Sequence, residues 1–259
     1  MRLLPVVILL SLNAAAFSQD APKKIPPAGI SVPEAERAGL TTGAADLLAD
    51  ITALKRKLAT DTRLLALLPD VEIFHKAVAG SLEDDTFYTP QEIAFAKKLL
   101  TTGRERARQL AGKKAPWLDA KGLILRGYRS RIDSSVQPYG LVVPPDLDLT
   151  KPVPLMVWLL GRGEKRTELA FLAERESRPP ELTPKNTLIV VPYGRYCNAT
   201  KFAGETDVME ALAAARAQYK VDPLRIAVAG FSMGGGGSVD AAGVGVNPNS
   251  LVSNEDRKS

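Results

Sequence analysis

The sequence predicts an α/β fold, in which a sheet covered by helices follows a small helical region. Residues 31–113 carry apolar side chains near helical spacing, whereas the chain from Gly122 onward consists of short apolar runs between turn residues. The run at residues 155–160 is apolar without interruption, which is typical of a strand buried on both faces. With 259 residues, 45% of them hydrophobic, the chain has material for one large core.

Three helices are expected in the helical region. Residues 31–34, Ser-Val-Pro-Glu, have the pattern of a helix start with serine as cap and proline in the first turn, and this helix should continue to about Ala59. Residues 89–92, Thr-Pro-Gln-Glu, repeat the signal. Between them, Pro69 can open a third helix that continues through Ala79.

Five strands and one crossover helix are expected after Gly122. The helix is predicted at residues 205–220, and since it connects the last two strands, those strands should run parallel. The predicted strands are residues 123–128, 136–143, 155–160, 188–191 and 226–230.

The candidate nucleophile is Ser232. Residues 225–235 read RIAVAGFSMGG, a buried strand that runs directly into G-x-S-x-G. In this pattern the backbone reverses so sharply that the serine is strained, and only glycine at 230 and 234 avoids a collision. The amides of the helix that follows, beginning with Met233, can then stabilise an oxyanion. The alternative is an incidental serine in a glycine-rich turn; the preceding strand, helix and strand favour the nucleophile.

A second oxyanion donor is expected where the third strand ends, in Leu160-Gly161-Arg162-Gly163. Glycines there allow the backbone to turn an N–H toward a substrate. The amide of Arg162 is the first choice and that of Gly163 the second. The alternative is an ordinary turn between a strand and a helix.

These motifs carry a family resemblance. Residues 154–165, 191–195, 204–208 and 221–235 resemble the secreted prolyl-oligopeptidase-like and polyhydroxybutyrate-depolymerase-like esterase branch of the α/β-hydrolases, over roughly residues 122–237. The resemblance implies a nucleophile at Ser232, backbone donors at Met233 and near Arg162, and an acid and a histidine after the nucleophile. That branch usually has histidine before Gly-x-Gly, where this chain has Leu160.

The chain departs from the family pattern in its catalytic base. The acids after Ser232 are Asp240, Glu255 and Asp256, and no histidine follows it. A serine without a base is a weak nucleophile near neutral pH. We therefore expect an impaired hydrolase, truncated from a longer esterase or peptidase, for example by a frameshift near Gly236. In that case the later strands are missing and the last strand lies open at its edge.

The N-terminus has the pattern of a signal peptide. Arg2 precedes an apolar run at residues 3–12, and small residues at Ala16 and Ser18 predict cleavage after Ser18 and a secreted or periplasmic protein. A retained anchor is less favoured, because about 20 apolar residues are needed to span a bilayer. The predicted organisation is a signal peptide (1–18), a linker (19–30), the helical region (31–113), a partial α/β-hydrolase domain (114–243) and a disordered tail (244–259).

The composition of the chain limits the kinds of partner that it is expected to bind. The net charge of +5 comes from 34 basic and 29 acidic residues spread along the chain, which argues against a nucleic-acid site. One cysteine, Cys197, and one histidine, His75, predict no metal site and no cofactor, and His75 is interpreted as a packed structural residue. Two functions stay open: an exported serine hydrolase acting on a small ester or peptide, or a non-catalytic, decayed hydrolase fragment with a binding role or none.

Overall fold

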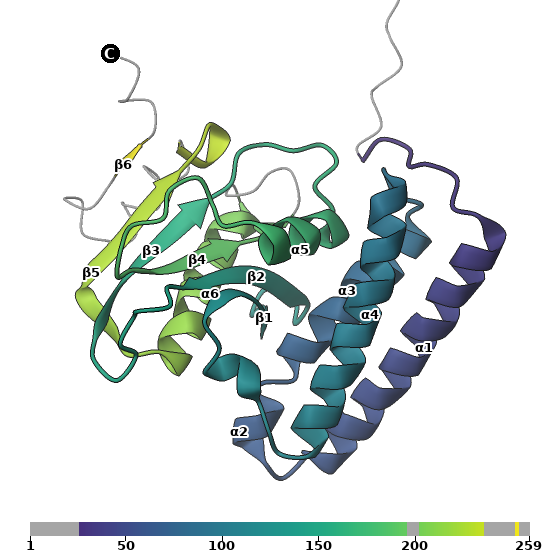
Figure 1. The fold of residues 1–259 in the computed structure, drawn as a ribbon, viewed down its shortest axis with the longest axis horizontal. Helices are drawn as coiled ribbons and strands as arrows, with labels where there is room; N and C mark the ends of the chain where they lie inside the picture. Colours follow the sequence, from purple (N-terminus) through teal and green to yellow (C-terminus); the bar gives the residue numbers. More distant parts are fainter. Residues whose placement is uncertain (1–25, 196–201, 236–251, 254–259) are drawn as a thin grey trace, which may run out of the picture.

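The computed structural model describes residues 26–195, 202–235 and 252–253 (Figure 1). The predicted signal peptide, Cys197 and most of the predicted tail lie outside these residues. The helical region consists of α1 (Glu34–Lys57), α2 (Thr62–Leu65), α3 (Pro69–Glu83), α4 (Pro90–Ala111) and the 3-10 helix η1 (Pro116–Leu118). In this described part, no helix has the length and apolar character needed to cross a membrane.

One of the two predicted serine or threonine helix starts is confirmed and the other is wrong. The Thr89 side chain accepts a hydrogen bond from the amide of Glu92 at 3.3 Å, and the Glu92 carboxylate accepts one from the amide of Tyr88 at 2.7 Å. For α1, Pro33 occupies the N-cap in an extended conformation, so Ser31 lies too far from the helix start to act as its cap. The fixed φ of proline suits both the N-cap and the first turn of a helix. The local pattern alone therefore did not show which of these positions Pro33 occupies.

The sheet contains the five predicted strands and one short addition. In chain order they are β1 (Gly122–Arg129), β2 (Val136–Val143), β3 (Val153–Leu159), β4 (Leu188–Pro192), β5 (Val221–Gly230) and β6 (Val252–Ser253). The order across the sheet is β1-β2-β4-β3-β5-β6. The pairs β1–β2 and β2–β4 are antiparallel, whereas β3 pairs in parallel with β4 and with β5. The fold is therefore a mixed, mainly parallel sheet with an antiparallel edge.

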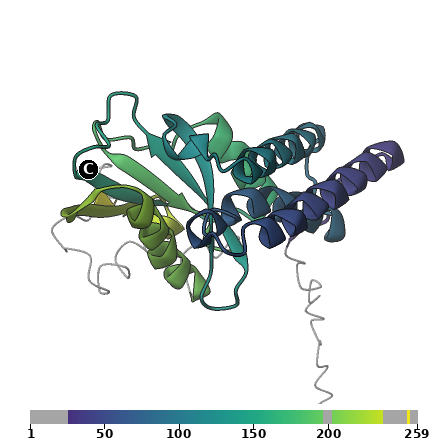
Figure 2. The same ribbon diagram turned by 90° about the horizontal axis from the view of Figure 1, so that it is seen from below.

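Helices cover both faces of this sheet (Figures 1 and 2). The crossover helix α6 (Ala203–Gln218) connects β4 to β5, and both strands run parallel to β3, which lies between them, as predicted. On one face, Gly140 of β2 lies against Arg175 of α5 (Glu168–Ser177). On the other face, the hydroxyl of Tyr128 donates to the carbonyl of Asp207 in α6 at 3.2 Å.

A buried carboxylate ties the helical region to the sheet. Asp70 of α3 is fully buried. It accepts hydrogen bonds from Arg126 Nε at 2.9 Å, from the amide of Gly127 at 2.8 Å and from Trp117 Nε1 at 2.9 Å. A buried charge requires such partners, and three donors supply them. The apolar side chains of the helices and of the sheet form one continuous core around this contact.

Among the described residues, the outer edge of β5 is paired only where the strand ends. Val252 and Ser253, which the sequence placed in a disordered tail, pair in parallel with Ala229 and Gly230. Earlier in β5, Leu224 has 83% of its surface exposed. No described strand pairs with β5 on that side before Ala229, and the open edge expected from the sequence stays a prediction.

Candidate active site

Ser232 occupies a strained turn directly after β5. The strand is held to its neighbour up to Phe231, whose amide donates to the carbonyl of Leu159 at 3.1 Å. The next residue, Ser232, has a φ of 53°, a left-handed conformation that is uncommon for residues other than glycine. The chain then enters a helical turn, in which the amide of Gly235 donates to the carbonyl of Ser232 at 2.9 Å. This is the strand, turn and helix expected of a nucleophile elbow.

The two glycines that flank the turn are required by close backbone approach. A Cβ atom on Gly230 would lie 2.5 Å from the carbonyl carbon and oxygen of Gly234. A Cβ atom on Gly234 would overlap the carbonyl of Leu159 in β3. Any larger residue at either position would force the turn away from the sheet, so the glycines set the position of Ser232.

The loop that follows β3 lies beside Ser232. A Cβ atom on Gly161 would lie 3.4 Å from the Cβ of Ser232. This follows from the topology, because β3 and β5 are parallel neighbours whose carboxyl ends meet at one edge of the sheet. Arg166 holds the loop in place: its Nη1 donates to the carbonyl of Gly161 at 2.5 Å and its amide to the carbonyl of Gly163 at 3.1 Å.

The predicted oxyanion donors belong to the two segments that meet at Ser232. The amide of Met233 is the first in the helical turn after Ser232, and first-turn amides have no acceptor within their own helix. Arg162 and Gly163 belong to the loop beside Ser232, and the Arg162 side chain is exposed and pairs with Glu164 at 3.2 Å. The donor role of each of these amides stays a prediction.

The structure does not bring a histidine to Ser232. His75 lies on α3, which packs against β1 and β2, and the strands β4 and β3 lie between those strands and β5. Burial lowers the pKa of His75, and the nearby charge of Glu72 opposes that shift only in part. The later acids Asp240, Glu255 and Asp256 lie outside the described residues, within which no three potential metal ligands are grouped.

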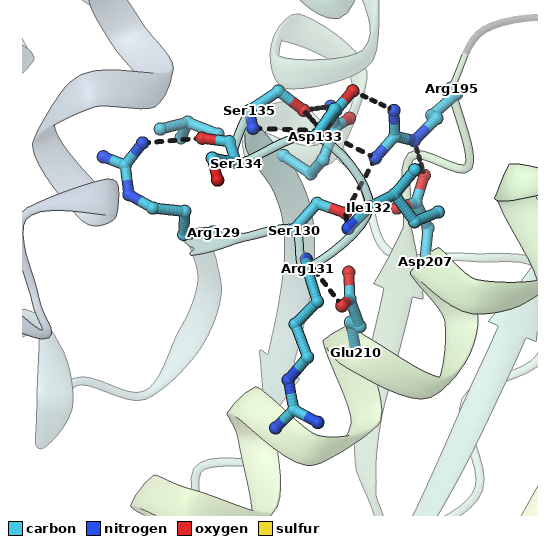
Figure 3. Close-up of polar contacts among 12 residues, drawn as sticks. Arg129, Ser130, Arg131, Ile132, Asp133, Ser134, Ser135, Arg195, Asp207 and Glu210 are labelled. Atoms are coloured by element: carbon cyan, nitrogen blue, oxygen red, sulfur yellow. Dashed lines mark hydrogen bonds and ion pairs between the residues drawn. The ribbon is translucent and has the colours of Figure 1, made fainter.

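A second polar constellation, not predicted as a site, surrounds Arg195 just after β4 (Figure 3). Arg195 donates from Nε to the Asp207 carboxylate at 2.7 Å, from Nη1 to Asp133 at 2.6 Å and from Nη2 to the hydroxyl of Ser130 at 2.8 Å. We call this set the Arg195 clamp. It joins the carboxyl end of β4 to the turn between β1 and β2 and to α6. In the sequence, residues 191–195 and 204–208 stood out only as family-like motifs, and no local spacing rule links them.

The clamp contains one buried and one exposed carboxylate. Asp207 has no exposed side-chain surface, and this burial raises its pKa against the opposing effect of Arg195. Hydrogen bonds from Arg195 and Ser135 hold the pKa of the exposed Asp133 well below its usual range. Arg195 itself has a φ of 56°, so the chain turns sharply where the arginine reaches all three partners. The clamp therefore orders the same sheet edge that carries Ser232.

The sheet is mixed, helices cover both of its faces, and the strained Ser232 follows the parallel strand β5. This is the α/β-hydrolase arrangement. The helical region that precedes the sheet is present as predicted.

Neither a protein-family model nor a curated protein matches this chain. Solved structures that align with it include a thermostable esterase (22% identity, TM-score 0.32, covering 48% of this chain and 37% of that one). Another is an S-formylglutathione hydrolase from Agrobacterium tumefaciens (18% identity, TM-score 0.37, covering 50% of this chain and 55% of that one). A third is a ferulic acid esterase (22% identity, TM-score 0.33, covering 46% of this chain and 53% of that one). The chain spans less than two thirds of the length of each of these proteins.

Proposed function

We propose that this protein is a serine hydrolase that cleaves a carboxylic ester or a peptide bond by acyl transfer through Ser232. The observation that supports the proposal best is the position of Ser232, strained at a φ of 53° and next to the Gly161 loop at the carboxyl ends of β3 and β5. Its oxygen attacks the substrate carbonyl, the leaving group departs with a proton, and water then releases the acid. The amides of Met233 and Arg162 stabilise the oxyanion.

The proposed activity is low for this chain. Its one histidine, His75, is half-buried on α3, which packs against β1 and β2, and these strands are separated from β5 by β4 and β3. Without a general base, a serine hydrolase retains only the contributions of its oxyanion hole and of substrate binding. Ester substrates are favoured slightly over peptides, because an activated ester needs less assistance to its leaving group.

Labelling with a fluorophosphonate tests the nucleophile. We expect slow covalent labelling of the full chain at Ser232, identified by peptide mass spectrometry, and loss of that label in Ser232→Ala. Ser134→Ala is the matched control, because Ser134 is also an exposed serine with a positive φ, 59°, but lies in the turn between β1 and β2. Equal labelling at Ser134 and Ser232, or none at Ser232, would overturn the proposal.

The second candidate function is a non-catalytic binding role. It is favoured because no histidine of the described residues lies near Ser232. Failure of the folded protein to react with the fluorophosphonate and with p-nitrophenyl acetate would support this function over hydrolysis.

We also propose that the chain is exported after cleavage between Ser18 and Gln19, on the basis of the charged and apolar pattern of its first 18 residues. Expression of the full chain in a bacterial host, followed by fractionation and N-terminal sequencing, tests this. A mature protein that begins at Gln19 and is found outside the cytoplasm is the expected result. A full-length protein that stays with the cytoplasm would contradict it.

A further inference from the structure

A large groove lies at the outer edge of β1, at the opposite end of the described sheet from β5 and β6. Its volume is about 840 Å³, within the range of about 300–1,000 Å³ that is usual for small-molecule sites. One wall comes from the helical region, with Leu65, Ala66 and Leu68, and the other comes from α6, with Ala214 and Ala217. The groove therefore offers an apolar channel between two parts of the fold.

The charged side chains in this groove have one sign. Lys55, Arg126 and Arg129 line it, and no aspartate or glutamate of the described residues does. Their carboxylate partners are not among the lining residues: Glu72 pairs with Lys55 at 2.7 Å and with Arg129, and Asp70 pairs with Arg126 at 2.9 Å. Two carboxylates against three cations leave a positive charge in excess, which favours an anionic ligand.

A buried donor lies in the lining as well. Tyr139 of β2 is fully buried, and its hydroxyl has no hydrogen-bond partner among the described residues. A buried polar group without a partner destabilises the structure, and a ligand or water oxygen beside it would remove that cost. The lining thus combines apolar walls, excess positive charge and an unmatched hydrogen-bond donor.

We propose that this groove binds a small anionic amphiphile, namely a carboxylate with an unbranched apolar chain. The chain lies along Leu65, Leu68 and Ala217, and the carboxylate faces Arg129 and Lys55. The site is separate from Ser232, because β1 and β5 are on opposite sides of the β2-β4-β3 strands. It therefore does not depend on the proposed hydrolase activity.

Calorimetric titration of the full chain with decanoate, below its micelle concentration, tests the proposal. Ala217→Trp fills the groove from an exposed position of α6 and should weaken decanoate binding about tenfold or more, since the apolar chain then loses its space. Ala213→Trp, on the same helix and also exposed but outside the groove lining, is the matched control and should bind normally.

The charge preference is tested separately. Arg129→Gln should weaken decanoate binding about threefold or more and leave binding of 1-decanol unchanged, because only the anion loses a partner. Arg131→Gln makes the same charge change outside the lining and should have no effect. The proposal is overturned by the absence of decanoate binding, by equal binding of decyltrimethylammonium, or by binding that neither Ala217→Trp nor Arg129→Gln weakens. If circular dichroism shows that Ala217→Trp is unfolded, the comparison of Arg129→Gln with Arg131→Gln tests the proposal in its place.

Discussion

Gly230 and Gly234 face each other across the turn at Ser232 so closely that a single methyl group would not fit between them. A Cβ atom on Gly230 would lie 2.5 Å from the Gly234 carbonyl. The five residues from Gly230 to Gly234 are thereby folded into a reversal that places a serine hydroxyl at the edge of the sheet. The first two predictions test this geometry without relying on catalysis.

Replacement of Gly230 by alanine should lower the free energy of unfolding by more than about 2 kcal/mol, because the new methyl group collides with backbone that cannot move aside. Gly39→Ala is the control. Gly39 lies inside α1 with nothing within 4 Å of its Cβ position, so alanine there should stabilise the protein by about 1 kcal/mol. Urea denaturation followed by circular dichroism measures both changes. Equal effects of the two substitutions would show that the turn is looser than described.

Replacement of Ser232 by glycine should stabilise the fold by about 1 kcal/mol relative to Ser232→Ala, because glycine adopts a positive φ without strain. Both variants remove the hydroxyl, so both should lose the fluorophosphonate label while differing in stability. Thermal and urea unfolding of the pair provide the measurement. If the alanine variant proves the more stable, Ser232 does not carry the strain that its φ of 53° indicates.

Replacement of Arg195 by alanine should cost about 3 kcal/mol, since it leaves the buried Asp207 carboxylate without its cation. Adding Asp207→Asn should recover part of that loss, because the buried group is then neutral. Arg162→Ala is the control: its ion pair with Glu164 is exposed and should contribute less than about 1 kcal/mol. A double-mutant cycle in urea measures the coupling between Arg195 and Asp207, and additive effects would contradict the clamp.

Glu168 should make stability depend on pH. Burial raises the pKa of its carboxyl group, although Lys76 opposes the shift, and Oε2 has no partner among the described residues. A raised folded-state pKa contributes stability that is complete below the ordinary value of 4.5 and is lost as the pH rises through the folded-state value. The difference in unfolding free energy between the native protein and Glu168→Gln should therefore fall from pH 4.5 toward neutrality. Urea denaturation at several pH values measures it, and a difference that rises with pH would contradict this assignment.

The sequence determined the elements whose causes are local. Short β-rich runs marked all five of the longer strands, the run at 155–160 being apolar without interruption. Thr89 with Glu92 marked the start of α4. The spacing of glycine around Ser232 predicted a strained turn, because the collision that requires it involves residues only four apart. Where two local solutions compete, as at Ser31 and Pro33, pattern alone selected the wrong N-cap.

The tertiary structure decided every feature that joins distant parts of the chain. Asp70 and Arg126 are 56 residues apart, and Arg195 and Asp133 are 62 apart, yet each pair forms a direct ion pair. The groove at β1 likewise combines α6 with the helical region. The sequence around a charged residue does not show which residue it pairs with. A buried charge finds its counter-charge only when packing brings a distant part of the chain beside it. Ser232 was therefore visible in the sequence, whereas the clamp and the groove were not.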